Sequence, residues 1–238
     1  MRALRTVLVI LVVLAGLFVA ADRIAVNLAE DEVAEKLKAQ LGSVSSGDPS
    51  VSIDGFPFLT QVAAKDLDKV TVGVEGVTAS AGGRQVRLSE VTMEAHDVEL
   101  SGDFSSAVAD RATGTVHLSY ADLTRAADDG VRVGYGGTST SGKDQVKVTA
   151  SVTLPLVGRA VERSVYSTVS VTGGDTVRLH ADEVPGSKIP GVEAAVRKKI
   201  DFARTISQLP EGLELTRVEA DKDGVDVSME GTGVRLAG

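Results

Sequence analysis

The stretch Val70-Thr71-Val72-Gly73-Val74-Glu75 alternates valine with polar or small residues. Successive side chains of a β-strand point to opposite faces, so this alternation predicts a strand with one apolar face. The same period of two recurs along the middle of the chain. The further alternating positions are Val86/Leu88, Val91/Met93/Ala95, Val116/Leu118/Tyr120, Val131/Val133/Tyr135, Val146/Val148/Ala150/Val152/Leu154, Val165/Ser167/Val169/Val171 and Val177/Leu179.

Turn-forming residues separate these alternating runs. They are Gly82-Gly83, Asp128-Asp129-Gly130, Gly136-Gly137 and Gly173-Gly174. Strands joined by such turns predict an antiparallel meander with one apolar face. Near the C-terminus, Leu213–Ala220 and Gly224–Glu230 are expected to form a hairpin, with a short strand at Val234–Leu236 after it.

Two amphipathic helices are expected beside the strands, because apolar residues recur mostly at helical spacing in two segments. The first segment is Asp22–Leu41, and the second is Gly191–Leu209, which lies between Pro190 and Pro210. The apolar stripes are Ile24, Leu28, Val33, Leu37 and Leu41 in the first helix, and Val192, Val196, Ile200, Ala203 and Ile206 in the second. We therefore predict an α+β fold, in which a long curved antiparallel β-sheet meander wraps around two amphipathic helices.

The N-terminus is typical of a targeting segment. Arg2 and Arg5 precede an uncharged apolar run from Thr6 to Ala21. As a helix this run covers about 24 Å, less than the roughly 30 Å of a hydrocarbon core. It indicates either a cleaved secretory signal peptide or an uncleaved signal-anchor, and both place the rest of the chain outside the cytoplasmic membrane. We predict residues 1–21 as this segment and 22–238 as one extracytoplasmic domain, which is either secreted or anchored by its N-terminus to the outer face of the cytoplasmic membrane.

Composition excludes several classes of partner and ligand. The net charge of −8 becomes −10 without Arg2 and Arg5, which argues against nucleic acid and against broad adsorption to anionic membranes. The chain has no cysteine, so disulfides and thiolate metal sites are excluded. His96, His117 and His180 have no local partner at metal-ligand spacing, and we expect neither a metal nor a cofactor.

The interior is expected to be lined by short aliphatic side chains, because 43% of residues are hydrophobic but only 3% are aromatic. Such side chains fill the span of a curved sheet poorly. Either the sheet collapses tightly onto the helices, or a dry apolar gap remains that accepts an apolar guest. Composition alone leaves both alternatives open.

The segment Gly55-Phe56-Pro57-Phe58-Leu59-Thr60-Gln61 carries two of the few aromatic residues, on either side of a proline. Proline fixes its own φ and disfavours helix at the residue before it, so we expect a stiff, extended turn. Phe56, Pro57, Phe58 and Leu59 either form a core plug at a strand entrance or line and gate one end of an apolar tunnel.

Three further regions complete a pattern along the chain. They are the N-terminal order of apolar segment, Asp22-Arg23 and amphipathic stretch, then Gly114-Thr115-Val116-His117-Leu118-Ser119-Tyr120-Ala121-Asp122-Leu123, and Leu209-Pro210-Glu211-Gly212-Leu213-Glu214-Leu215 before the C-terminal hairpin. With Gly55–Gln61, they resemble the LmeA-like phospholipid-binding family of actinobacterial cell-envelope proteins. The resemblance implies an extracytoplasmic, tubular lipid-binding fold that holds phospholipid, a role in envelope glycolipid assembly, and no catalytic residues.

A lipid would contact both predicted helices. Leu28 and Leu37 of the first helix, and Val196 and Ile200 of the second, are candidate acyl-chain contacts beside Phe56–Leu59. The cations of the second helix either meet a phosphate headgroup or form its solvated face. These headgroup candidates are Arg197, Lys198, Lys199 and Arg204.

Catalytic motifs are not found. Gly137–Asp144 approaches a phosphate-binding loop, but Asp144 replaces the magnesium-binding Ser or Thr and a strand follows. No Gly-x-Ser-x-Gly elbow occurs, and no tryptophan is present to hold a sugar ring. We predict a non-enzymatic carrier or sensor that sequesters the acyl region of a phospholipid or glycolipid. The alternatives are a scaffold or regulator of a membrane glycosyltransferase and, least favoured, a hydrolase of envelope lipid or glycan.

Overall fold

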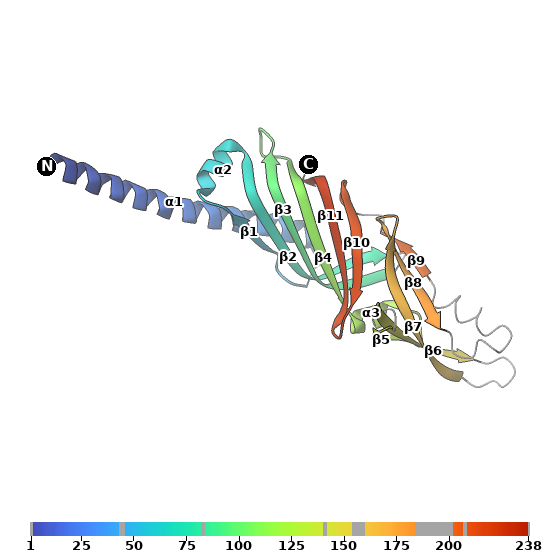
Figure 1. Ribbon diagram of the computed structural model, residues 1–238. Coiled ribbons are helices and arrows are strands. Elements are labelled where there is room, and N and C mark those ends of the chain that lie inside the picture. The colour runs from blue at the N-terminus through green and yellow to red at the C-terminus, as the bar shows by residue number, and fades with distance from the viewer. Residues whose placement is uncertain are drawn as a thin grey trace.

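The computed structural model describes residues 2–42, 46–81, 84–139, 142–153, 160–183, 202–206 and 209–237. The molecule is elongated, and a long N-terminal helix projects from one end of the β-structure (Figure 1). This helix, α1, spans Arg2–Leu41, and two short helices follow: α2 (Phe58–Ala64) and α3 (Tyr120–Ala126). The predicted helix over Asp22–Leu41 is confirmed, and it continues the apolar segment without a break.

The larger sheet has six antiparallel strands in the order β1-β2-β3-β4-β11-β10. Their bounds are Ser50–Asp54 for β1, Asp66–Ala81 for β2, Arg84–Leu100 for β3, Ala107–Ser119 for β4, Leu213–Ala220 for β10 and Gly224–Ala237 for β11. The predicted C-terminal hairpin is confirmed as β10 and β11. The short strand expected at Val234–Leu236 is the end of β11, because β11 stays paired with β4 to its last residue.

The smaller sheet has five antiparallel strands in the order β5-β6-β7-β8-β9. Their bounds are Val131–Thr138 for β5, Asp144–Thr153 for β6, Ala160–Thr172 for β7, Thr176–Glu183 for β8 and Phe202–Thr205 for β9. The α+β class and the antiparallel strands are confirmed, but the meander is divided. It breaks at Tyr120, which was expected to end a strand and instead begins α3, and β4 pairs with β11 rather than with β5.

The second predicted helix is wrong over the part that the structure describes. Phe202–Thr205 forms β9, which pairs with the edge of β8 from Leu179 to Thr176. Backbone pairing with this strand edge prevails over a helical spacing of apolar residues, because local propensity is weaker than tertiary context. The rest of the predicted helix, residues 191–201 and 207–208, lies outside the described residues.

Two separate cores stabilise the molecule. The distal core joins the two sheets, and its buried members are Val116, Val146, Val148, Val165, Leu179, Ala181, Leu215, Ala220, Val225 and Val227. The proximal core lies between the larger sheet and the helices α1 and α2, and its buried members are Val26, Ile53, Phe58, Leu67, Ala95, Val98, Ala109, Ala112, Leu213 and Val234. Both cores use the same face of the larger sheet, which we call its inner face.

Helix α3 connects the two sheets and is capped by a hydrogen-bonded network. The Ser119 hydroxyl accepts a hydrogen bond from Asp122 N–H at its N-terminus. The buried Asp122 carboxylate accepts hydrogen bonds from Ser119 Oγ (2.8 Å) and Ser89 Oγ (3.1 Å), and it pairs with Arg125. Burial raises the pKa of Asp122, but these hydrogen bonds and the Arg125 charge prevail and lower it below 3.8.

We expect Asp122→Asn to destabilise the protein more at neutral pH than in acid. The pKa of Asp122 is lower in the folded state, so its contribution is present above the unfolded value and is lost as pH falls through the folded value. Urea denaturation of both proteins at neutral pH and at about pH 3 measures this. A difference between them that stays constant or grows in acid would contradict the assignment.

Candidate lipid-binding site

The two phenylalanines of Gly55–Gln61 have different environments. Pro57 precedes α2 with extended backbone (φ −80°, ψ 137°), and the helix begins at Phe58. The expected extended turn therefore ends at Pro57, and the prediction was wrong for the residues after it. Phe58 is buried in the proximal core, whereas Phe56 is 58% exposed. The structure thus gives Phe58 a packing role and leaves Phe56 and Leu59 at the surface.

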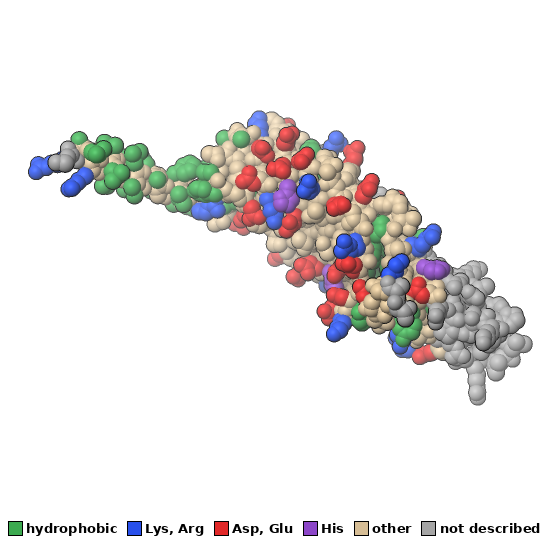
Figure 2. Space-filling model, in the orientation of Figure 1, with side chains coloured by type: hydrophobic (Ala, Val, Ile, Leu, Met, Phe, Trp, Pro, Cys, Tyr) green, Lys and Arg blue, Asp and Glu red, His purple; other side chains and the backbone are tan. Residues whose placement is uncertain are grey.

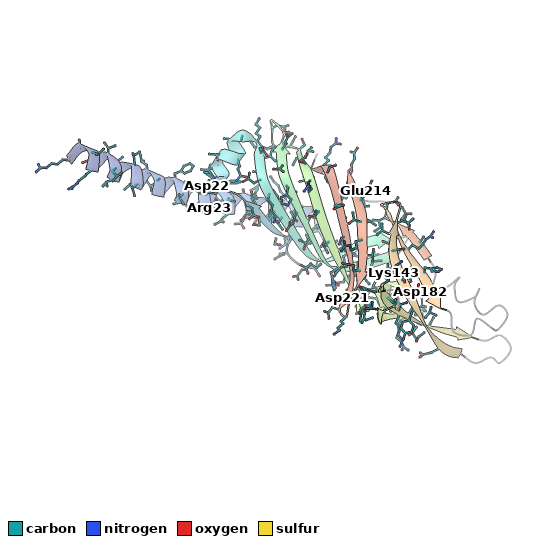
Figure 3. All side chains as sticks on the ribbon, viewed as in Figure 1. Asp22, Arg23, Lys143, Asp182, Glu214 and Asp221 are labelled. Carbon is teal, nitrogen blue, oxygen red and sulfur yellow. The ribbon has the colours of Figure 1, made fainter. Side chains whose placement is uncertain are left out.

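Asp22 holds this segment against α1, a role that the sequence did not indicate. Its side chain is fully buried, and it lies with Arg23 where α1 meets the sheet (Figure 3). Asp22 Oδ1 accepts a hydrogen bond from Leu59 N–H (2.8 Å) at the start of α2, and Oδ2 accepts one from Arg23 (2.7 Å). A carboxylate at a helix start satisfies otherwise unpaired N–H groups.

Gln61 makes the second link of the same segment. Its side-chain oxygen accepts a hydrogen bond from Asp68 N–H (2.8 Å), and Gln61 is buried. Helix α2 is thereby tied both to α1 and to the first residues of β2. Asp22 and Gln61, the buried polar residues beside this segment, therefore serve to hold α2 in place.

The predicted apolar stripe of α1 is wrong near its start. Ile24 and Leu28 are 60% and 64% exposed, while Val26 is buried and Ala25 and Ala29 pack on the proximal core. Leu37, the other candidate on this helix, is half-buried. The four-residue spacing predicted one apolar stripe of α1, but the neighbouring stripe of smaller side chains contacts the sheet. These smaller side chains allow the helix to approach the sheet more closely.

The other sequence candidates cannot be assembled into the site. Val196, Ile200, Arg197, Lys198 and Lys199 lie outside the described residues. Arg204 belongs to β9, where its backbone pairs with Val177 of β8. The headgroup assignment to these cations stays a prediction.

The structure instead shows an apolar row across the whole larger sheet, which pairing arranges strand by strand. It consists of Val51, Val72, Met93, Gly114, Met229 and Leu215 on β1, β2, β3, β4, β11 and β10. Val72, Met93 and Met229 are only half-buried. Met229 packs against both cores, so the row lies between them on the inner face.

Gly114 gives the middle of this row its shape. A Cβ atom at position 114 would lie 2.9 Å from Cγ of Met229 and 3.5 Å from Cγ of Met93. The two methionine side chains therefore lie over the glycine from both sides. Methionine is flexible and polarizable, so this part of the inner face can adapt to an irregular apolar ligand.

The opposite face of the same strands is polar. One hollow of about 430 Å³ is lined by Glu94, His96, Asp97, Asp110, Arg111 and Thr113, and another of about 210 Å³ by Glu90, Thr92, Thr115, His117 and Asp226. His96 and His117 face away from the apolar row, and His117 Nδ1 lies 2.7 Å from Asp226 Oδ1. Within the described residues, no cluster of His, Asp and Glu could hold a metal ion. A hydrocarbon chain would find little apolar surface in these hollows. The inner face is therefore the better candidate for the lipid-binding surface.

An open antiparallel sheet with a part-exposed apolar inner face offers surface against which an apolar ligand can be buried. Comparison with known families agrees: residues 20–230 match the profile of the LmeA-like phospholipid-binding family. The chain belongs to this family, which is a lipid-binding family and not a known enzyme family. No curated protein matches the chain, and no solved structure does.

Proposed function

We propose that this protein is an exported phospholipid-binding protein that holds an acyl chain against the apolar row of its larger sheet and supports cell-envelope lipid or glycolipid assembly. The observation that carries the proposal is that Val72, Met93 and Met229 stay only partly buried between two well-buried cores. Family membership supports phospholipid as the ligand. The bound lipid would complete the inner face where the protein's own side chains leave it open.

Hydrocarbon burial is large enough to drive this binding. Each buried methylene contributes about 0.8 kcal/mol, so eight of them supply roughly 6 kcal/mol before ordering costs. Broad electrostatic attraction to anionic lipids should contribute little to the affinity, because the opposite face is polar and the net charge of the chain is −8. Recognition would therefore depend mainly on the acyl region.

The N-terminal helix supports a location at the outer face of the cytoplasmic membrane. Among the described residues, α1 is the one helix long and apolar enough to cross a membrane. This is consistent with a signal peptide or an anchor. In Figure 2 hydrophobic side chains cover the projecting part of α1, and charged side chains are scattered over the visible face of the sheet.

Lipid recovery tests the proposal directly. We expect native mass spectrometry of the purified protein to show a mass above that of the chain alone. Organic extraction should then release phospholipid, at one molecule or a fixed small number per chain. Recovery of no lipid from folded protein would contradict the proposal and favour the scaffold or glycosyltransferase-regulator alternative. Turnover of an envelope lipid or glycan by the same preparation would instead indicate an enzyme.

A further inference from the structure

Exposed apolar side chains gather at the end of the larger sheet from which α1 projects. Outside α1, the described residues expose seven large apolar side chains, and five of them lie at this end. The five are Phe56, Leu59, Phe104, Val108 and Leu236. They come from the start of α2 and the loop before it, the turn between β3 and β4, the start of β4 and the end of β11, which Figure 1 shows together at this end.

Each of the two exposed phenylalanines at this end has a cation over its ring. The guanidinium carbon of Arg23 lies 5.3 Å from the ring centroid of Phe56, and Nζ of Lys65 lies 6.0 Å from that of Phe104. Lys65 caps the C-terminus of α2, so the two pairs lie at opposite ends of this short helix. An aromatic ring with an adjacent cation suits the headgroup level of a bilayer, where the ring is buried and the charge meets phosphate.

The apolar surface of α1 reaches this same end. Leu17, Ile24 and Leu28 lie at helical spacing on one face and are all about 60% exposed. On this face the apolar surface extends from Thr6 to Leu28, a length of about 34 Å, comparable to the hydrocarbon thickness of a bilayer. A helix inserted to Leu28 brings Arg23, Phe56 and the start of α2 to the membrane surface.

We infer that Phe56, Leu59 and Phe104, with Arg23 and Lys65, form a membrane-docking tip that inserts into the outer leaflet beside α1. The tip fixes the orientation of the sheet relative to the membrane. This inference goes beyond the proposed function, because it concerns contact with the bilayer surface and does not require a sequestered acyl chain.

The charges at the tip indicate what kind of membrane it needs. Asp22 pairs with Arg23, and Asp103, whose pKa is lowered to about 2 by hydrogen bonds from Ser101 and Ser105, lies beside Phe104 in sequence. The tip therefore carries both signs of charge. Insertion should depend on apolar burial, and neutral phosphatidylcholine should suffice as the docking surface.

Tryptophan reporters in the full-length chain test the tip, since the natural sequence has no tryptophan. Phe56→Trp and Phe104→Trp place the reporter in the tip, and Tyr166→Trp is a matched control on the smaller sheet, where Tyr166 is also exposed. The variants are reconstituted into phosphatidylcholine vesicles, with and without phosphatidylglycerol, that contain lipids brominated at shallow acyl positions. Replacing one exposed aromatic residue by another is expected to preserve the fold.

We expect several-fold stronger quenching and blue-shifted emission at positions 56 and 104 than at 166, with little dependence on phosphatidylglycerol. Quenching at 56 and 104 no stronger than at 166 would overturn the inference. Quenching at 56 alone would also overturn it, because closeness to α1 would then explain the signal. Phospholipid recovered from detergent-solubilised protein of the same preparation reports on the proposed function separately, so the two can fail independently.

Discussion

Replacing Phe58 with alanine is expected to lower the free energy of unfolding by about 3–5 kcal/mol, as for other buried phenylalanines. Phe58 is 6% exposed and packs in the proximal core, which joins α1, α2 and the larger sheet. Truncation leaves a cavity where these three elements meet. Urea denaturation in detergent solution, followed by circular dichroism, measures the loss.

Phe56→Ala is the matched control for Phe58→Ala. Phe56 is 58% exposed, and its contact with Arg23 is of a kind worth about 0.5–1 kcal/mol at an exposed site. We therefore expect a loss below about 1 kcal/mol. Equal losses in the two variants would contradict the different environments of the two rings.

The comparison also decides how a gate at Gly55–Gln61 can be tested. A charged substitution at Phe58 is expected to unfold the proximal core, so loss of lipid from such a variant would not identify a gate. Phe56 and Leu59 are exposed and can be changed without this effect. A gating role therefore remains a prediction for these two residues.

Replacing Met93 with tryptophan is expected to abolish most lipid loading while the protein stays folded. Met93 is half-buried in the middle of the apolar row, so the indole would cover the surface on which the acyl chain is proposed to lie. The free energy of unfolding should fall by no more than about 1–3 kcal/mol, the loss typical of overpacked cores, because the tryptophan side chain can extend outward. Native mass spectrometry gives the lipid-bound fraction.

Thr92→Trp is the control for Met93→Trp, since it places the same indole side chain on the adjacent residue of β3. Thr92 faces the polar hollow on the opposite side of the sheet. We expect wild-type loading in this variant. Loading that falls equally in both variants would indicate a general effect on the sheet, and full loading in Met93→Trp would remove the apolar row as the binding surface.

Much of the secondary structure could be predicted from local sequence. Alternation around Val70–Glu75 predicted β2, and the hairpin formed by β10 and β11 was predicted to within a residue at its turn. His96 and His117 occupy the polar positions next to the alternating apolar residues, and they line the polar hollows. These features depend on residues that are neighbours along the chain, and the two faces of a strand are distinguished by which side chains can leave water.

The candidate site was harder to predict from the sequence, because its residues are distant from one another along the chain. Val72, Met93, Gly114 and Met229 became one row only when four strands were placed in register. Nothing in the sequence near Gly114 indicated that two methionines would lie over it. Buried Asp22, which binds the start of α2 across 37 residues, was missed for the same reason.

The sequence by itself determined the β-rich α+β class, the apolar N-terminal helix and the inward side of the strands that show clear alternation, because these depend on periodicity within a few residues. Only the tertiary structure decided that β4 pairs with β11, that Phe202–Thr205 joins a sheet, and that α1 packs through Val26 rather than Leu28. These contacts depend on which long-range pairings both satisfy backbone hydrogen bonds and bury apolar surface. Local sequence patterns are compatible with several such pairings.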